Sequence, residues 1–173
     1  MKVVCVIPAR YYSTRLPGKP LAKIAGKPMI QHVYERSSMA KRPDEVVVAT
    51  DHEQVFDTVK AFGGRVIMTS PDHPTGTDRL AEVAARMDGD VEIIVNVQGD
   101  EPLLAPALID VLAGEVESYP EGVMATLATP LEVEEYNEPS VVKVVTDLAG
   151  YALYFSRSLV PYPRNQSTGI FLK

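Results

Sequence analysis

Residues 3–21 read VVCVIPARYYSTRLPGKPL, and this stretch decides the fold. Its first five residues are apolar and mostly β-branched, with no polar alternation, which is typical of a strand covered on both faces. The loop that follows, residues 8–20, is much longer than the roughly 2 to 6 residues that usually join a strand to a helix. The stretch therefore predicts a buried strand followed by a functional loop.

Similar apolar runs recur along the chain, at 45–50, 65–69, 91–97, 123–129 and 141–146. Helical patterns alternate with the first of these runs, and their start signals are Pro28, Asp51 with Gln54, Thr77 and Pro106. This alternation predicts an α/β fold with a mostly parallel sheet flanked by helices. Residues 141–146 and 151–156 are typical of a hairpin, so we expect the sheet to be mixed.

The composition is that of an ordinary globular protein, with 46% hydrophobic residues and a formal net charge of −6 at pH 7. A disordered or collagen-like chain is excluded, and no apolar run approaches the roughly 18 residues that span a bilayer. Because no signal-peptide pattern is present, we expect a cytoplasmic location. The single cysteine, Cys5, is expected to be a small buried hydrophobic side chain. We expect one domain over residues 1–173.

Positive charge is concentrated at the N-terminal end. Residues 1–34 contain Lys and Arg but no Asp or Glu, whereas the rest of the chain carries 11 bases and 23 acids. These cations are spread among Pro, Gly, Ser and Thr, which favours a compact anionic ligand over a nucleic acid. Arg10 and Arg15 offer forked donors and Lys19 a point charge, as a triphosphate or pyrophosphate requires. The loop has neither the P-loop spacing nor the dinucleotide-binding pattern.

Two further loops follow predicted strands, where ligands collect in open α/β sheets. Residues 96–102 read NVQGDEP and place Asp100 opposite the cationic loop. There it can hold Mg²⁺ on a nucleotide, or it can simply cap the next helix. Residues 70–79 read SPDHPTGTDR and can offer hydroxyl groups and backbone amides to a base, with His73 expected to be an ordinary surface residue. No Ser, His and acid spacing points to a hydrolase.

Five long motifs resemble one family: IPARYYSTRLPGKPL at 7–21, VATDHEQV at 48–55, HPTGTDRLAEV at 73–83, NVQGDEPL at 96–103 and VVKVVTDLAGYALYFSRSLVPYPR at 141–164. Along nearly its whole length the chain is similar to the 3-deoxy-D-manno-octulosonate (Kdo) cytidylyltransferases, the CMP-Kdo synthetases. The resemblance implies a Rossmann-like nucleotidyltransferase fold with Mg²⁺ as cofactor. It also implies transfer of CMP from CTP to the anomeric hydroxyl of Kdo, with release of pyrophosphate, for lipopolysaccharide biosynthesis.

The resemblance also implies roles for individual residues. Those expected to bind the nucleotide are Pro8, Ala9, Arg10, Ser13, Lys19, Thr75, Gly76, Arg79 and Gln98. Those expected to bind the sugar acid are Arg15, Gln98 and Arg157. Asp100 is the expected metal ligand, and the expected catalytic set is Arg10, Arg15, Lys19 and Asp100. No general base is needed, because phosphoryl transfer relies mainly on positioning and charge neutralisation.

The resemblance weakens at the C-terminal end. Residues 167–171 read STGIF, where the family has a histidine before a Gly-Ile-Tyr run. The family's dimerisation region and its second metal-binding aspartate do not follow. We therefore expect a truncated chain that binds Mg²⁺ and CTP but is weak or inactive as a transferase, whereas the complete family protein is expected to be a homodimer. Two alternatives stay open: a cytidylyltransferase for another sugar acid, such as sialate, and a CTP-binding module without turnover.

Overall fold

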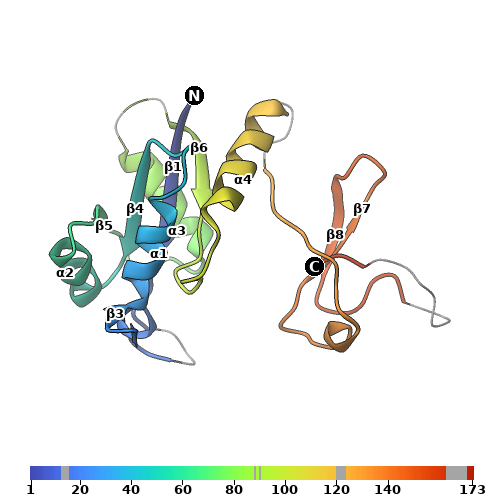
Figure 1. The fold of residues 1–173 in the computed structure, drawn as a ribbon, viewed down its shortest axis with the longest axis horizontal. Coiled ribbons are helices and arrows are strands. Elements are labelled where there is room, and N and C mark those ends of the chain that lie inside the picture. The colour runs from blue at the N-terminus through green and yellow to red at the C-terminus, as the bar shows by residue number, and fades with distance from the viewer. Residues whose placement is uncertain (13–15, 88, 90, 120–123, 163–170) are drawn as a thin grey trace. The chain divides into compact units, whose positions relative to one another are not determined.

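The computed structural model describes residues 1–12, 16–87, 89, 91–119, 124–162 and 171–173 of the 173-residue chain. The chain divides into two compact units, Met1–Ala125 and Thr126–Lys173. The first unit runs from blue to yellow in Figure 1 and the second from orange to red. The first unit contains the alternating strands and helices that the sequence predicts, and the second contains the predicted hairpin.

A four-stranded parallel sheet with the order β5-β4-β1-β6 forms the centre of the first unit. Its strands are β1 (Lys2–Pro8), β4 (Glu45–Thr50), β5 (Val66–Met68) and β6 (Val91–Asn96). The strand from the opening stretch, β1, lies between β4 and β6, so that Cys5 pairs with Val46 on one side and Val95 on the other. The predicted α/β class and parallel sheet are confirmed.

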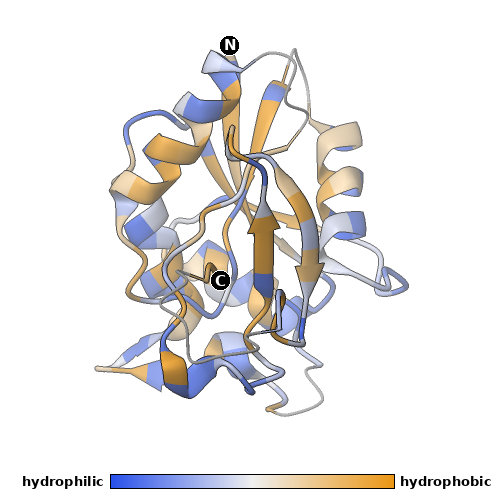
Figure 2. Cartoon of the chain, turned by 90° about the vertical axis from the view of Figure 1, so that its right-hand side faces the viewer, coloured by the Kyte–Doolittle hydropathy of each residue, from blue (hydrophilic) through white to orange (hydrophobic). Residues whose placement is uncertain are grey.

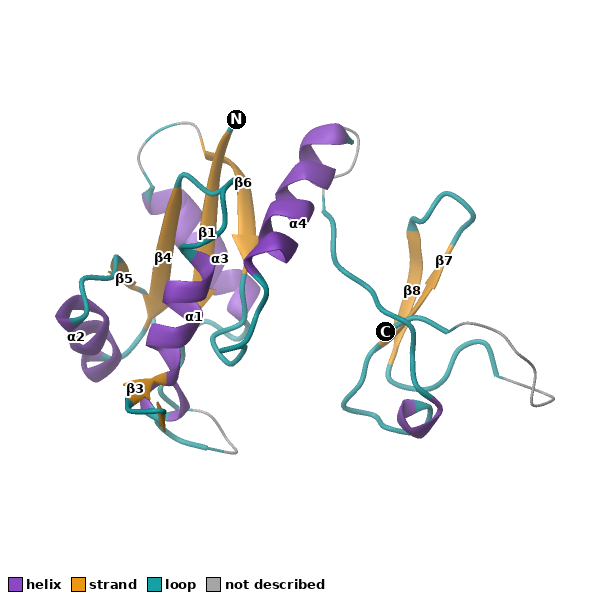
Figure 3. Cartoon of the chain, viewed as in Figure 1, coloured by secondary structure: helices purple, strands orange, loops and turns teal. Residues whose placement is uncertain are grey.

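Helices cover both faces of this sheet. In the described part of the chain they are α1 (Met29–Ser37), α2 (Glu53–Ala61), α3 (Gly76–Arg86) and α4 (Pro106–Ser118). Alternate side chains of β1 point to opposite faces: Cys5 and Ile7 belong to the core formed with α1, α2 and α4, whereas Val4 and Val6 pack with Leu80 of α3. Three helices therefore cover one face and α3 covers the other (Figure 3).

Apolar residues concentrate on the strands and on the inner sides of the helices, shown in orange in Figure 2, while hydrophilic residues gather on the loops. Cys5 has no exposed surface, as predicted for a small hydrophobic side chain. Burial raises the pKa of its thiol to about 12, so the thiolate is strongly disfavoured at neutral pH. In the described part of the chain no helix is both long enough and apolar enough to cross a bilayer.

Short elements follow the long loop after β1. They are η1 (Lys19–Leu21), a single 3-10 turn, and the antiparallel pair β2 (Lys23–Ile24) and β3 (Lys27–Pro28). Gly18 precedes η1 with φ at 71°, a left-handed conformation that glycine adopts without a steric cost. These elements lie at the carboxyl end of β1 (Figure 1), where the sequence places the functional loop.

The second unit is built around the hairpin of β7 (Lys143–Thr146) and β8 (Ala152–Ser156), with the short 3-10 helix η2 (Val133–Glu135) before it. The hairpin is confirmed, but it forms a two-stranded sheet of its own, and the four-stranded sheet contains only parallel pairs. The strand predicted over 123–129 is absent from residues 124–129. Met124 is 90% exposed, so burial does not hold this apolar run in a sheet.

Two helices begin at caps other than the predicted ones. Thr75 rather than Thr77 caps α3, and His52 rather than Asp51 caps α2. The carboxylate of Asp51 accepts a hydrogen bond from Arg79 instead. A local capping pattern is thus overridden by a contact between residues 28 positions apart.

Candidate functional site

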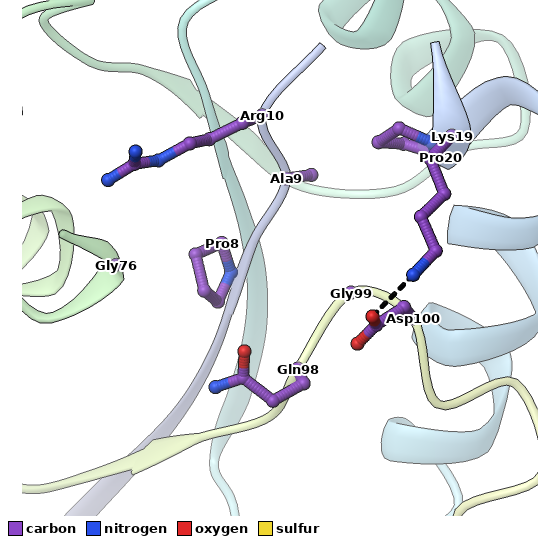
Figure 4. Close-up of a pocket in the computed structure, with 9 residues that line it drawn as sticks. All are labelled: Pro8, Ala9, Arg10, Lys19, Pro20, Gly76, Gln98, Gly99 and Asp100. Atoms are coloured by element: carbon purple, nitrogen blue, oxygen red, sulfur yellow. Dashed lines mark hydrogen bonds and ion pairs between the residues drawn. The ribbon is translucent and has the colours of Figure 1, made fainter. Parts of the chain in front are cut away.

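A pocket of about 220 Å³ lies at the carboxyl ends of β1 and β6, where open α/β sheets bind ligands. Its walls come from four places: the end of β1 with the residues after it, η1, the start of α3, and the loop after β6 (Figure 4). The lining residues are Pro8, Ala9, Arg10, Lys19, Pro20, Gly76, Gln98, Gly99 and Asp100. All except Pro20 and Gly99 are predicted site residues, so the structure brings most of the predicted set together.

Lys19 and Asp100 meet at this pocket as an ion pair. Lys19 Nζ donates to Asp100 Oδ2 at 2.5 Å and thereby joins two loops that are 81 residues apart in the sequence. The two side chains are 34% and 48% exposed, so a ligand can reach both. The helix after this loop, α4, has Ala105 as its N-cap residue and no side-chain cap hydrogen bond. The alternative reading of Asp100 as a helix cap is therefore excluded.

Arg10 contributes a second cation. Its guanidinium lies on the other side of Pro8 from the ion pair and is directed towards the start of α3 near Gly76 (Figure 4). Within the described structure, Arg10 Nη2 is a buried nitrogen with no hydrogen-bond partner. A buried donor without an acceptor is costly, and an anionic ligand in the pocket would remove that cost.

Gly99 is a site residue that the sequence analysis missed. A Cβ at this position would lie 2.8 Å from the backbone oxygen of Pro8, which is closer than side-chain carbons approach carbonyl oxygens. The absence of a side chain therefore allows the loop after β6 to lie directly against the end of β1. The available signal was the glycine between Gln98 and Asp100 at a predicted strand end.

The loop after β6 carries two further polar side chains. Gln98 lies beside Pro8 in the pocket, and its Nε2 donates to Asn96 Oδ1 at 3.3 Å. Glu101 follows Asp100, and its pKa is raised, chiefly by burial and then by the negative charge of Asp100.

Arg79, expected to bind the nucleotide, is directed elsewhere. Its side chain has no exposed surface, donates from Nη2 to Asp51 Oδ2 at 2.7 Å and donates from Nη1 to Thr69 Oγ1. It therefore ties α3 to the residues that follow β4 and β5. Thr75, also expected at the nucleotide, accepts a hydrogen bond from the Asp78 backbone as the cap of α3.

Residues 70–75 are fastened to α3 by Glu82. Its Oε2 accepts hydrogen bonds from the Ser70 backbone at 2.9 Å and pairs with His73 Nε2, and its other oxygen pairs with Arg86. These contacts lower the pKa of Glu82, with the hydrogen bond from His73 as the largest cause. His73, expected to be an ordinary surface residue, is only 20% exposed, and its contact with Glu82 holds the loop of residues 70–75 against α3.

Known proteins are similar to this chain in sequence and in fold. A family model described as Cytidylyltransferase matches residues 4–171. The chain belongs to the cytidylyltransferase family. Relatives named 3-deoxy-manno-octulosonate cytidylyltransferase are 57% identical to it over 167 residues in Geobacter sulfurreducens and 56% identical over 168 residues in Saccharophagus degradans. Each match covers 96% of this chain and 66% of the relative, so the chain spans slightly less than two thirds of their length.

A solved structure agrees with these relatives. The structure of a CMP:2-keto-3-deoxy-manno-octonic acid synthetase complexed with CTP superimposes with a TM-score of 0.94 at 50% sequence identity. The match covers 99% of this chain and 70% of that chain's length. The predicted nucleotidyltransferase-type fold is thereby confirmed.

The other predicted site residues either do not line the first pocket or fall outside the described residues. Ser13 and Arg15 fall outside the described residues. Arg157 belongs to the second unit, where its Nη1 donates to the backbone oxygen of Pro139 at 2.7 Å. It lines a second pocket, of about 490 Å³, with Tyr136, Asn137, Pro139, Ser158, Leu159 and Tyr162.

Proposed function

We propose that this cytidylyltransferase binds CTP at the carboxyl ends of β1 and β6 and transfers CMP to the anomeric hydroxyl of Kdo, which gives CMP-Kdo and pyrophosphate. The observation that carries the proposal is a pocket lined by the Lys19–Asp100 ion pair and by Arg10, whose Nη2 is buried without a hydrogen-bond partner among the described residues. The names of the relatives and the neighbour complexed with CTP support this pair of substrates.

Arg10 and Lys19 are the proposed phosphate ligands. A nucleoside triphosphate brings several negative charges, and further negative charge develops on the pyrophosphate as its bond to the α-phosphorus breaks. Arg10 supplies planar, forked donors and Lys19 a compact charge, and both lie in one partly sheltered pocket. Donors held in place before the reaction stabilise this developing charge without reorganisation, which lowers the barrier.

Magnesium fits the donors present at this site. In the described part of the chain no cluster of three or more His, Cys, Asp and Glu side chains is arranged to hold a metal ion. Mg²⁺, however, is commonly bound by one or two carboxylates together with substrate phosphates. Asp100 is the proposed protein ligand, and it would exchange part of its contact with Lys19 for the ion. When bound, Mg²⁺ would neutralise phosphate charge and lower the pKa of a coordinated hydroxyl.

The pocket around Arg157 is the proposed site for the carboxylate of the sugar acid, and the role of Gln98 towards the sugar stays a prediction. A guanidinium matches the two oxygens of a carboxylate, and the donation from Arg157 to the oxygen of Pro139 fixes its side chain. Tyr136 and Tyr162 add aromatic walls with hydroxyl groups to the same pocket. A cytoplasmic location, weak or absent turnover by this chain and a homodimeric complete protein stay predictions.

Thermal unfolding with Mg²⁺ and each of CTP, UTP, ATP and GTP tests the nucleotide site, because a ligand of the native state raises the midpoint. We expect a shift with CTP that is lost in Asp100→Asn. Asp57→Asn is the matched control, because Asp57 is exposed on α2. No shift with any nucleotide would overturn the proposed site.

Pyrophosphate release then tests the transfer itself. With CTP and Mg²⁺ we expect release that depends on Kdo. A shift with CTP but no release would favour a nucleotide-binding module over a transferase. Release with sialic acid in place of Kdo would assign a different sugar acid.

A further inference from the structure

We propose that His52 is a positioning residue for the cationic loop, residues 8–20. The ring of Tyr11 is stacked on the ring of His52, and Tyr11 in turn positions Lys19. The inference deepens the proposed function, and it rests on that function for its ligand, CTP. His52 does not line the pocket. It acts through a series of contacts in the first unit, from His52 to Tyr11, from Tyr11 to Gly18 and Lys19, and from Lys19 to Asp100.

The first contact is between aromatic rings. The rings of Tyr11 and His52 are stacked nearly parallel, with centroids 3.9 Å apart and an interplanar angle of 11°. Tyr12 meets the same histidine edge-on at 5.5 Å and meets Tyr11 edge-on at 5.2 Å. Aromatic pairs of this kind stabilise a contact beyond the area that they bury. The start of the cationic loop is thus held on a cluster of three rings.

The ring of His52, the platform for Tyr11, is fixed by secondary structure. His52 is the N-cap of α2, and its Nδ1 accepts a hydrogen bond from the Gln54 backbone at 3.3 Å. Its own backbone N–H donates to Thr50 Oγ1, at the end of β4. The ring orientation is therefore set by β4 and α2, both of which pack into the core, and not by the loop.

Two contacts connect Tyr11 to Lys19. The backbone oxygen of Tyr11 accepts from the Gly18 N–H at 2.8 Å, which closes the loop at its base. Gly18 faces the Tyr11 ring, since a Cβ at this position would lie 3.5 Å from that ring. Lys19 follows directly and reaches Asp100 at 2.5 Å. A shift of Tyr11 would therefore move the Lys19 ammonium.

Two substitutions separate the roles of His52 as platform and as helix cap. His52→Asn keeps an N-cap acceptor and removes the ring, whereas His52→Phe keeps the ring and removes the acceptor. We expect His52→Asn to weaken CTP binding about two- to tenfold, the range set by loss of one aromatic pair, with little change in the unfolding midpoint. We expect His52→Phe to lower the midpoint by about 2–4 °C and to change CTP binding less than about twofold.

Hydrogen exchange of the Gly18 amide tests the same idea without CTP. Exchange of this amide should be faster in His52→Asn and in Tyr11→Leu. The double variant should exchange little faster than either single variant, because both substitutions remove the same stacking contact. Exchange should stay unchanged in His52→Phe. If the wild-type chain does not bind CTP but the Gly18 amide responds as expected, the proposed function fails while the positioning role stands.

Two results would overturn the inference. One is wild-type CTP affinity together with wild-type Gly18 exchange in His52→Asn. The other is an equal loss of CTP binding in His52→Phe and His52→Asn, which would mean that the helix cap, and not the ring, matters to the loop.

Discussion

The Lys19 ammonium and the Asp100 carboxylate lie 2.5 Å apart, although they come from loops after two different strands. Both side chains are partly exposed, so the pair contributes little to stability, at most about 1 kcal/mol. Its consequence is chemical: a cation and an anion are placed side by side at the end of the parallel sheet. The cation suits phosphate, and the anion suits a metal ion held on that phosphate.

Lys19→Gln should weaken CTP binding without lowering the stability of the fold. We expect CTP affinity to fall about tenfold, because a charge-assisted contact to phosphate is lost, while the unfolding midpoint changes by less than about 2 °C. Calorimetric titration with CTP and Mg²⁺ measures the first and a thermal scan the second. Lys23→Gln is the control, because Lys23 is an exposed lysine on β2. Equal affinity in wild type and Lys19→Gln would contradict the assignment.

Gly99→Ala should disrupt the contact between the loop after β6 and the end of β1. The added Cβ would lie 2.8 Å from the Pro8 oxygen, so the loop must move. We expect a loss of about 1–3 kcal/mol in the free energy of unfolding, measured with urea, and weaker CTP binding. In Gly76→Ala the new Cβ would lie 3.7 Å from Pro8 Cγ, an ordinary contact, so its stability should stay near wild type. Similar stability losses in both variants would show that the close approach is not the cause.

Asp51→Asn should be strongly destabilising. The variant leaves the guanidinium of Arg79, which has no exposed surface, without its anionic partner. Breaking a buried pair in this way costs about 3–5 kcal/mol, measured as the free energy of unfolding. Glu35→Gln, which breaks the exposed pair with Lys27, should cost less than about 1 kcal/mol. A small effect in Asp51→Asn would mean that water or a rearranged side chain compensates the charge.

Glu82 should make stability depend on pH in the acid range. The hydrogen bond from His73, then the Ser70 backbone contact, lower its pKa in the folded state below the ordinary value of 4.5. The unfolded chain therefore binds this proton more readily, so the stabilisation is present above about pH 4.5 and is lost as the pH falls through the lower, folded value. Urea titrations from about pH 5 to about pH 3 should show a shallower loss in Glu82→Gln than in wild type. Glu115→Gln on α4 is the control, and an unchanged slope in Glu82→Gln would contradict the prediction.

Much of the fold was predictable because it depends on local pattern. The apolar run that contains Cys5 is a strand, and the helices begin close to their predicted starts, because burial on both faces and helical periodicity are local properties. The caps were less predictable, since Asp51 is drawn away by Arg79 from the other side of the sheet. The run at 124–129 is not a strand, and its residues are exposed among the described residues. Whether an apolar run is buried depends on residues far away in the chain, so it cannot be predicted from local pattern.

By itself the sequence determined the order of strands and helices and the chemistry of the pocket, because residue types and their spacing place Arg10, Lys19 and Asp100 after strand ends that a parallel sheet brings to one edge. Only the tertiary structure decided that Arg79 is turned away from this edge and that the ring of His52 carries the start of the loop. Contacts of that kind join segments far apart in the chain, and they depend on strand register and on the direction of each side chain, which no local pattern specifies.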